Sequence, residues 1–159
     1  MADVAVGKKV PAFSVEATGE GTVRSKDLAG SPYVLYFYPK DDTPGCTLEG
    51  QGFRDQLAKF KKLNVKVLGV SRDNLASHEK FRKKYDLPFD LISDADERLC
   101  RQFDVIKQKN MYGKKVMGIE RSTFLVDSKG VLRKEWRKVK VDGHVDEVLA
   151  AVQSLERPV

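Results

Sequence analysis

Apolar residues along this chain occur in two kinds of pattern, short continuous runs and helically spaced positions. Continuous runs rich in aromatic and β-branched residues are typical of strands that are buried on both faces of a sheet. Apolar residues three or four positions apart predict helices with one buried face. Continuous runs occupy Tyr33–Pro39, Val65–Ser71 and Phe89–Asp94. Helical spacing covers Pro44–Leu63, Asn74–Asp86, Asp96–Asp104 and Gly143–Glu156.

Glycine-containing turns predict a hairpin near each end of the chain. The segment Phe13–Gly30 is predicted to form two short strands around the turn Gly19–Gly21, followed by a helical turn. Closer to the C-terminus, the predicted strands Arg121–Asp127 and Val131–Val139 flank the turn Ser128–Gly130. The chain contains no internal repeat, low-complexity stretch or linker, so residues 1–159 are expected to form one domain.

This order of elements predicts an α/β fold. Strands that alternate with helices form a central sheet that is partly parallel and carries helices on both faces, here with an antiparallel hairpin added. A thioredoxin-like fold, with a central mixed β-sheet flanked by helices and an N-terminal β-hairpin, fits this order best. Active sites of open α/β sheets lie beyond the carboxyl ends of the strands. The strand Tyr33–Pro39 ends at that edge, and Cys46 follows it.

The composition is that of a soluble globular protein, with 41% hydrophobic and 33% charged residues. No apolar run approaches the roughly 20 residues of a membrane-spanning helix, and we expect no membrane association. The first residues, Met1–Phe13, lack a basic segment followed by a long apolar one, so a secretory signal is not expected. With only two cysteines, Cys46 and Cys100, the chain suits the reducing cytoplasm.

The net charge of +6 raises the possibility of a nucleic-acid partner. The basic residues are, however, spread along the chain and interleaved with acids, as on solvated helix faces and strand edges. Neither zinc-finger spacing nor an RNA-binding aromatic signature accompanies them. We therefore expect no nucleic-acid binding.

Cys46 stands in the first turn of a predicted helix, directly after a predicted strand. The partial positive charge and free N–H groups of a helix N-terminus stabilise a thiolate, and such cysteines can have pKa values of roughly 3.5–7.5. Pro44 suits the helix start because its missing N–H costs nothing there. Thr43 could cap the helix or direct its hydroxyl at a ligand. The alternative is a buried, unreactive cysteine at a strand–helix junction.

The other residues limit the chemistry that such a thiolate could perform. A cysteine protease or acyl transferase needs a histidine base, but His78 and His144 have no recognisable catalytic context and are expected to be surface or half-buried residues. A Cys-x-x-Cys motif is absent, since Glu49 stands three residues after Cys46. Two cysteines and two distant histidines do not form a zinc site, so neither a metal nor an organic cofactor is expected. A lone activated thiolate suits a small oxidant with an O–O bond.

Two segments resemble the peroxiredoxin family. The sequence PKDDTPGC, Pro39–Cys46, matches the signature P-x-x-x-T/S-x-x-C. Its continuation, DDTPGCTLEGQGFRD, resembles in particular the peroxiredoxin Q or bacterioferritin comigratory protein subfamily. The second segment, GIERSTFLVDSKG at Gly118–Gly130, places Arg121 at the family's active-site arginine. The resemblance extends over nearly the whole chain and implies a thioredoxin-like fold and a thiol peroxidase that acts on hydrogen peroxide and organic hydroperoxides.

The resemblance also implies a role for each of the matched residues. Cys46 is the peroxidatic nucleophile, whose thiolate attacks a peroxide oxygen and becomes a sulfenic acid. Arg121 keeps the thiolate charged and donates to the oxygens, while the Thr43 hydroxyl and nearby backbone N–H groups complete the cradle. Pro39 shields the site from water, and Glu49 orients an arginine.

The sequence departs from the subfamily at the resolving cysteine. Many members carry it five residues after the peroxidatic cysteine, where this chain has Gln51, or in the next helix near the position of Arg82. Cys100 is the only other cysteine, and its position in a predicted helix indicates core packing, with a resolving role as the alternative. A one-cysteine cycle is therefore expected, in which thioredoxin, glutaredoxin or a small thiol reduces the sulfenic acid.

Three functional hypotheses remain open. The first is a thioredoxin-dependent or other thiol-dependent peroxidase, which the resemblance implies to be a monomer. The second is a peroxide sensor or interaction protein that uses the same sulfenic acid to form mixed disulfides. The third is a nucleic-acid binder, whose affinity would depend steeply on salt.

Overall fold

The computed structural model describes residues 4–19 and 21–155. Its strands are β1 (Ser14–Ala17), β2 (Gly21–Arg24), β3 (Tyr33–Phe37), β4 (Lys66–Ser71), β5 (Leu91–Ser93), β6 (Ile106–Met111), β7 (Lys114–Ile119), β8 (Ser122–Val126) and β9 (Leu132–Trp136). Its helices are α1 (Ser25–Leu28), α2 (Pro44–Lys62), α3 (Leu75–Tyr85), α4 (Arg98–Gln102) and α5 (His144–Leu155). None of the helices in this part of the chain is long and apolar enough to cross a membrane. Two predicted positions, Glu20 in the first turn and Glu156 at the end of the last helix, lie outside the described residues.

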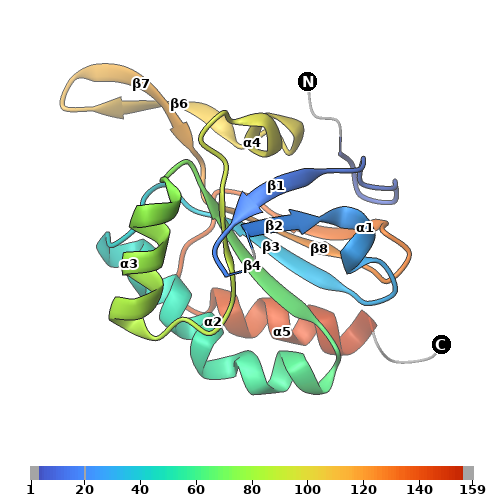
Figure 1. The fold of residues 1–159 in the computed structure, drawn as a ribbon. Coiled ribbons are helices and arrows are strands. Elements are labelled where there is room, and N and C mark those ends of the chain that lie inside the picture. Colours follow the sequence, from blue (N-terminus) through green and yellow to red (C-terminus); the bar gives the residue numbers. More distant parts are fainter. Residues whose placement is uncertain (1–3, 20, 156–159) are drawn as a thin grey trace.

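The central sheet has seven strands in the order β2-β1-β5-β4-β3-β8-β9 (Figure 1). The neighbours β3, β4 and β5 are parallel, whereas β8 pairs antiparallel with β3 and β1 pairs antiparallel with β5. The sheet is therefore mixed, and its N-terminal hairpin β1–β2 lies at one edge. This confirms the predicted α/β architecture, including the added hairpins at β1–β2 and β8–β9.

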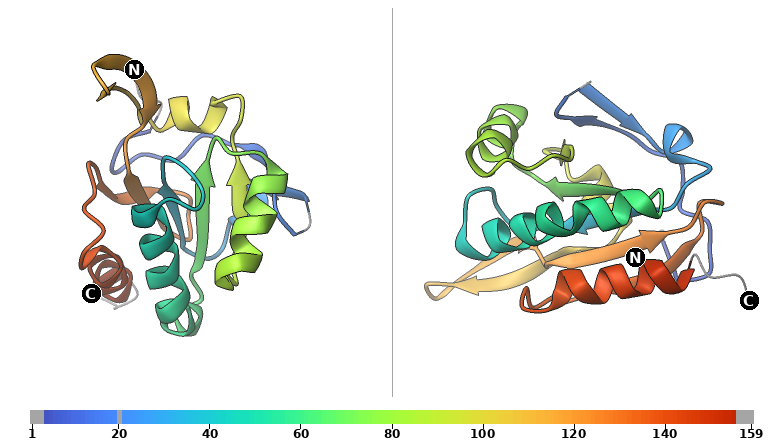
Figure 2. Two further views of the ribbon diagram at one scale, coloured as in Figure 1. Left: turned by 90° about the vertical axis from the view of Figure 1, so that its left-hand side faces the viewer. Right: turned by 90° about the horizontal axis from the view of Figure 1, so that it is seen from below.

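Buried apolar residues form one cluster on each face of this sheet. One cluster joins α2, α3 and α5 to the sheet, and Figure 2 shows α2 and α5 side by side across that face. The other cluster joins α4, α1 and the N-terminal hairpin to the opposite face. Side chains of a strand alternate between faces, and those of β3 accordingly divide between the two clusters. β3 is buried along its whole length, as its continuous apolar run predicts.

Most of the predicted elements are confirmed, and several of them differ in detail. The strand predicted over Tyr33–Pro39 ends at Phe37, and the helix predicted over Asp96–Asp104 shortens to α4. Asn74 caps α3, with its side chain accepting from the N–H of Ser77 at 2.8 Å. Leu48 lies within the predicted helix Pro44–Leu63 but is 61% exposed, because it lies off the stripe of residues that faces the sheet.

The hairpin β6–β7 has no counterpart among the predicted elements. It forms a separate two-stranded sheet with a two-residue turn at Tyr112 and Gly113, whose φ values are 52° and 79°. Two positive φ values are typical of a type I′ hairpin turn, in which asparagine and glycine give the usual sequence signal. The hairpin was not predicted because a tyrosine occupies the usual asparagine position of the turn and because its strands are rich in lysine. The hairpin projects from the body of the molecule (Figure 1). Its second strand, β7, ends at Ile119, shortly before Arg121 in the sequence.

Candidate active site

Cys46 lies in the first turn of α2, beyond the carboxyl end of β3. The loop of residues 38–43 follows β3, and Pro44 occupies the first position of the helix. The N–H groups of Gly45 and Cys46 have no acceptor one turn earlier in the helix, so they remain available to a ligand. Cys46 is 1% exposed, and its sulfur therefore lies in a nearly closed site.

Arg121, between β7 and β8, reaches two residues of α2. Its Nη2 group lies 3.4 Å from Cys46 Sγ, and its Nη1 group donates to Glu49 Oε1 at 2.7 Å. A Cβ atom on Gly45 would lie 3.0 Å from Nη2, so the glycine leaves room for this approach. A guanidinium in this position can donate hydrogen bonds to a negatively charged group at the sulfur.

Glu49 stands one helical turn after Cys46 and is fully buried. Burial raises the pKa of Glu49 to about 7, although the charge of Arg121 and its hydrogen bond oppose the shift. Oε1 accepts from Arg121, whereas Oε2 has no hydrogen-bond partner among the described residues. Burial lowers the pKa of Arg121, but the charges of Glu49 and Cys46 outweigh it and raise that pKa overall. The buried carboxylate thus holds the guanidinium beside the sulfur.

Thr43 and Pro39 belong to the loop that leads to Cys46. Thr43 Oγ1 donates to the carbonyl oxygen of Lys40 at 2.8 Å and does not cap α2, so the capping alternative is wrong. Because its hydrogen is used by Lys40, the hydroxyl oxygen can still accept a hydrogen bond from a ligand. Pro39 is half-buried in the same loop.

Cys100 lies in α4, in the apolar cluster on the other face of the sheet from Cys46. It is fully buried, as core packing predicts. Burial, followed by the charge of Asp94, raises the pKa of the Cys100 thiol well above its ordinary range. Gln51 in α2 and Arg82 in α3, the two positions at which the resemblance implies a resolving cysteine, do not supply a thiol.

Both histidines are buried, so the expectation that they are surface or half-buried residues is wrong. Each ring finds a polar partner inside the protein. His144 Nε2 lies 2.7 Å from Thr123 Oγ1, and His78 Nδ1 lies 2.7 Å from Asp41 Oδ2. Burial and the nearby charge of Arg121 lower the pKa of His144 to about 4, so this ring is neutral at pH 7.

Glu49→Gln is expected to change the pH dependence of stability. Because the folded-state pKa of about 7 exceeds the ordinary value of 4.5, the folded protein binds more protons than the unfolded chain between these pH values. The contribution of Glu49 to stability is therefore greatest below pH 4.5 and is lost as the pH rises through 7, by on the order of 3 kcal/mol. The glutamine variant lacks this loss, and its stability relative to wild type should rise from pH 5 to pH 8.

Urea unfolding of both proteins at pH 5, 6.5 and 8 measures this difference. His144 adds a background of opposite sign, because its lowered pKa makes the folded state bind fewer protons below pH 6.5. That background is common to both proteins and cancels in the difference between them. Parallel curves of unfolding free energy against pH would contradict the raised pKa of Glu49.

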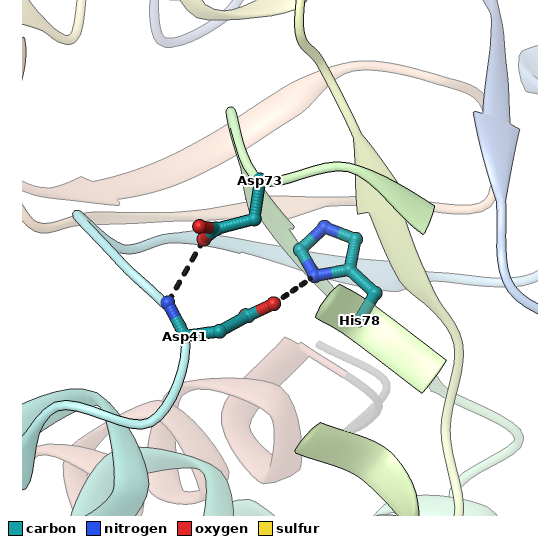
Figure 3. A group of neighbouring side chains, drawn as sticks. All are labelled: Asp41, Asp73 and His78. Carbon is teal, nitrogen blue, oxygen red and sulfur yellow. Dashed lines mark hydrogen bonds and ion pairs between the residues drawn. The ribbon is translucent and has the colours of Figure 1, made fainter. Parts of the chain in front are cut away.

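A polar cluster joins Asp41, in the loop of residues 38–43, to Asp73 and His78, and it was not identified from the sequence (Figure 3). One potential ligand atom from each residue lies within 4.8 Å of the others, a spacing that a metal ion could use. Hydrogen bonds within the protein already occupy these atoms. The only signal in the sequence was the position of Asp41 between Pro39 and Thr43.

Lys109 of β6 is a second residue near the site that the sequence did not reveal. Burial, followed by the charge of Arg121, lowers the pKa of Lys109, while the charge of Cys46 opposes the shift. Its aliphatic chain packs over Gly118 on the facing strand, where an added Cβ would lie 3.4 Å from Lys109 Cδ. The hairpin β6–β7, which was not predicted from the sequence, therefore brings the positively charged side chain of Lys109 towards Arg121.

Comparisons with known proteins identify the family. Residues 6–135 match the model of the AhpC/TSA family. The peroxiredoxin Bcp of Xanthomonas campestris is 59% identical over 126 residues, which cover 79% of each chain. That of Bacillus subtilis is 47% identical over 152 residues, which cover 96% of this chain and 97% of the relative. A solved structure of the X. campestris bacterioferritin comigratory protein has a TM-score of 0.87 and 51% identity, covering 91% of this chain and 92% of that one.

A thioredoxin-like fold with a cysteine and an arginine in contact at a helix start defines a thiol peroxidase of the peroxiredoxin class. The match over most of its length shows that the chain belongs to the AhpC/TSA family, and its relatives place it among the Bcp/Q peroxiredoxins. These findings confirm both the resemblance seen in the sequence and the thioredoxin-like fold.

Proposed function

We propose that residues 1–159 act as one peroxiredoxin domain that reduces hydrogen peroxide and organic hydroperoxides through a sulfenic acid on Cys46. The observation that carries this proposal is the 3.4 Å contact between Arg121 Nη2 and Cys46 Sγ at a helix N-terminus. The related X. campestris protein was studied for its alkyl peroxide reduction activity, which supports organic hydroperoxides as substrates here.

The oxidative step transfers two electrons from sulfur to the peroxide. The Cys46 thiolate attacks the hydroxyl oxygen of the peroxide, and the S–O bond forms as the O–O bond breaks. The leaving group departs as hydroxide or alkoxide and takes a proton from water, so that the enzyme keeps a sulfenic acid. Arg121 donates to the oxygens as negative charge moves from the sulfur to the leaving group, and one such preorganised donor is typically worth about 10²–10³ in rate.

The remaining residues orient the peroxide and the guanidinium. The Thr43 oxygen accepts from the O–H of the peroxide, since its own hydrogen is held by the carbonyl of Lys40. The free N–H groups at the start of α2 add donors on the other side of the O–O bond. Glu49 fixes the direction of Arg121 through their 2.7 Å ion pair, and half-buried Pro39 limits the access of water.

The reductive step uses an external thiol. A disulfide requires Cα atoms within about 7 Å, and Cys100 lies on the other face of the sheet from Cys46. One thiol condenses with the sulfenic acid, which releases water and leaves a mixed disulfide. A second thiol then displaces Cys46 as a thiolate, so each peroxide reduced yields one disulfide of the reductant. Thioredoxin, glutaredoxin or a small thiol fits this role, and we propose a monomeric enzyme in the cytoplasm.

Cys100→Ala is expected to retain at least about half of the wild-type turnover with thioredoxin or with dithiothreitol. The substitution removes the second thiol and costs about 1 kcal/mol of stability, as is usual for a small change in a core. Steady-state consumption of peroxide with each reductant measures the effect. Loss of the thioredoxin-dependent rate alone, with the dithiothreitol-dependent rate intact, would make Cys100 a resolving cysteine.

A peroxide sensor or interaction protein is the second candidate function. The presence of Gln51 and Arg82 instead of cysteines favours this function. Without a thiol at either position, the sulfenic acid on Cys46 persists until an external thiol reacts with it. Such a sulfenic acid can form a mixed disulfide with a partner protein. Fast oxidation of Cys46 followed by less than one turnover with any of the three reductants would favour the sensor over the enzyme.

A further inference from the structure

The active-site loop of residues 38–43 is held to α3 by a buried pair of side chains, Asp41 and His78 (Figure 3). Asp41 belongs to the loop and His78 to α3, and their side chains are 3% and 0% exposed. His78 Nδ1 lies 2.7 Å from Asp41 Oδ2. The pair therefore joins the loop that precedes Cys46 to a helix far from it in the sequence.

Both side chains of this pair have further hydrogen-bond partners. His78 Nε2 lies 2.9 Å from the carbonyl oxygen of Ile92, which can only accept, so Nε2 carries a hydrogen. The Asp41 carboxylate already accepts from the hydroxyls of Tyr38 at 2.6 Å and Ser77 at 2.8 Å. Every polar side-chain atom of the pair therefore has a hydrogen-bond partner inside the protein.

Asp73 holds the backbone of the same loop. Its Oδ2 atom accepts from the N–H of Asp41 at 2.8 Å and from the hydroxyl of Ser71 at 2.6 Å. These bonds, together with those of His78, use the atoms that a metal ion would need. The cluster is thus an internal hydrogen-bonded clamp that ties the loop to the ends of β4 and β5.

The next residue of the loop is held by the other end of α3. Asp42 has a left-handed backbone, with φ of 58°. Its carboxylate accepts from Lys84 Nζ at 2.8 Å and from the Tyr85 hydroxyl at 2.6 Å. Two successive residues of the loop are therefore anchored to α3, and Thr43 and the first turn of α2 follow at once.

We propose that Asp41 and His78 are a positioning pair, which keeps Cys46 in contact with Arg121 by fixing the active-site loop to α3. This inference rests on the proposed function and assigns the buried histidine a part in it. The helix α3 carries no thiol, so no residue of this helix has to reach Cys46 during the cycle. The clamp can therefore stay closed through the whole cycle.

Two substitutions of His78 separate its two contacts. In His78→Asn, the amide nitrogen falls near the position of Nδ1 and can still donate to Asp41. In His78→Gln, the amide nitrogen falls near the position of Nε2 and keeps only the bond to Ile92. Both variants replace the imidazole ring by a neutral amide, so each is the control for the other.

The test compares two reactions of Cys46 in each reduced, folded protein. Rapid mixing with hydrogen peroxide gives the rate of sulfenic acid formation, and iodoacetamide gives the rate of alkylation. His78→Gln should oxidise about tenfold more slowly, because displacement of the sulfur from Arg121 by a fraction of an ångström is costly. It should be alkylated several-fold faster, because an opened loop exposes the sulfur. His78→Asn should stay within about threefold of wild type in both reactions.

The two rates are compared only in proteins with the circular dichroism and unfolding free energy of wild type, because general unfolding would also expose Cys46 to alkylation. Equal rates in all three proteins, or equal losses in both variants, would overturn the positioning role. Should His78→Gln fail to fold, Tyr38→Phe removes one donor to Asp41 and keeps the ring, and it should shift the two rates in the same opposite directions. Unchanged rates in that variant would overturn the role as well. A wild-type Cys46 that does not react with peroxide would instead refute the proposed function itself.

Discussion

Cys46→Ser is expected to abolish peroxide reduction, with turnover lower by on the order of 10⁴-fold or more, as for other catalytic nucleophiles. A serine hydroxyl is not ionised at neutral pH and cannot replace the thiolate as a nucleophile. The exchange of sulfur for oxygen removes little volume from a residue that is 1% exposed, so the fold should be retained. Peroxide consumption with excess thioredoxin or dithiothreitol measures the loss.

The matched control for this variant is Cys100→Ala. It removes the other buried thiol, which lies on the opposite face of the sheet. If Cys46→Ser kept a tenth of the wild-type turnover while Cys100→Ala lost it, Cys46 would not be the nucleophile. Circular dichroism of both variants shows whether a loss of activity reflects a loss of fold.

Arg121→Met is expected to lower the rate constant for oxidation of Cys46 by about 10²–10³-fold, the usual cost of removing one preorganised donor. Methionine keeps much of the apolar volume but loses the contacts to Cys46 at 3.4 Å and to Glu49 at 2.7 Å. Rapid mixing of reduced protein with hydrogen peroxide measures the rate constant. A rate within threefold of wild type would contradict the proposed role of Arg121.

The same substitution should also destabilise the protein, because Glu49 is left buried without its cation. Removing one partner of a buried ion pair typically costs about 3–5 kcal/mol. Burial raises the pKa of Glu49 to about 7 even with Arg121 present, so the loss should be largest at pH 8 and shrink as the carboxylate binds a proton at lower pH. The double variant Arg121→Met/Glu49→Gln should recover stability but not the oxidation rate. Recovery of both would show that Arg121 acts only by neutralising Glu49.

The central features of the site could be predicted because they lie in local sequence. An apolar run that ends in a loop and a helix start places Cys46 beyond β3, and this placement needs no knowledge of distant contacts. The two segments that resemble the peroxiredoxin family also identified Arg121 and Glu49 as site residues. Their contact in the structure joins residues 72 positions apart, which the resemblance implied and periodicity alone could not.

The buried residues that hold the active-site loop in place could not be predicted, because their contacts depend on the order of the strands in the sheet. His78 meets Asp41 only because β3, β4 and β5 are neighbours and end at the same edge. Its burial overrides the usual exposure of an isolated histidine, since the fold supplies partners for both ring nitrogens. Lys109 was missed for a different reason, because its strand carries lysines where an apolar alternation would have revealed a hairpin.

Treatment of the reduced wild-type protein with one equivalent of hydrogen peroxide, in the presence of dimedone as a trap for sulfenic acids, tests whether Cys46 is the peroxidatic nucleophile. Intact and peptide masses then locate the adduct. We predict one dimedone adduct on Cys46, with Cys100 still a thiol. An unmodified Cys46 in the folded protein would contradict the account, and a Cys46–Cys100 disulfide would contradict the one-cysteine cycle.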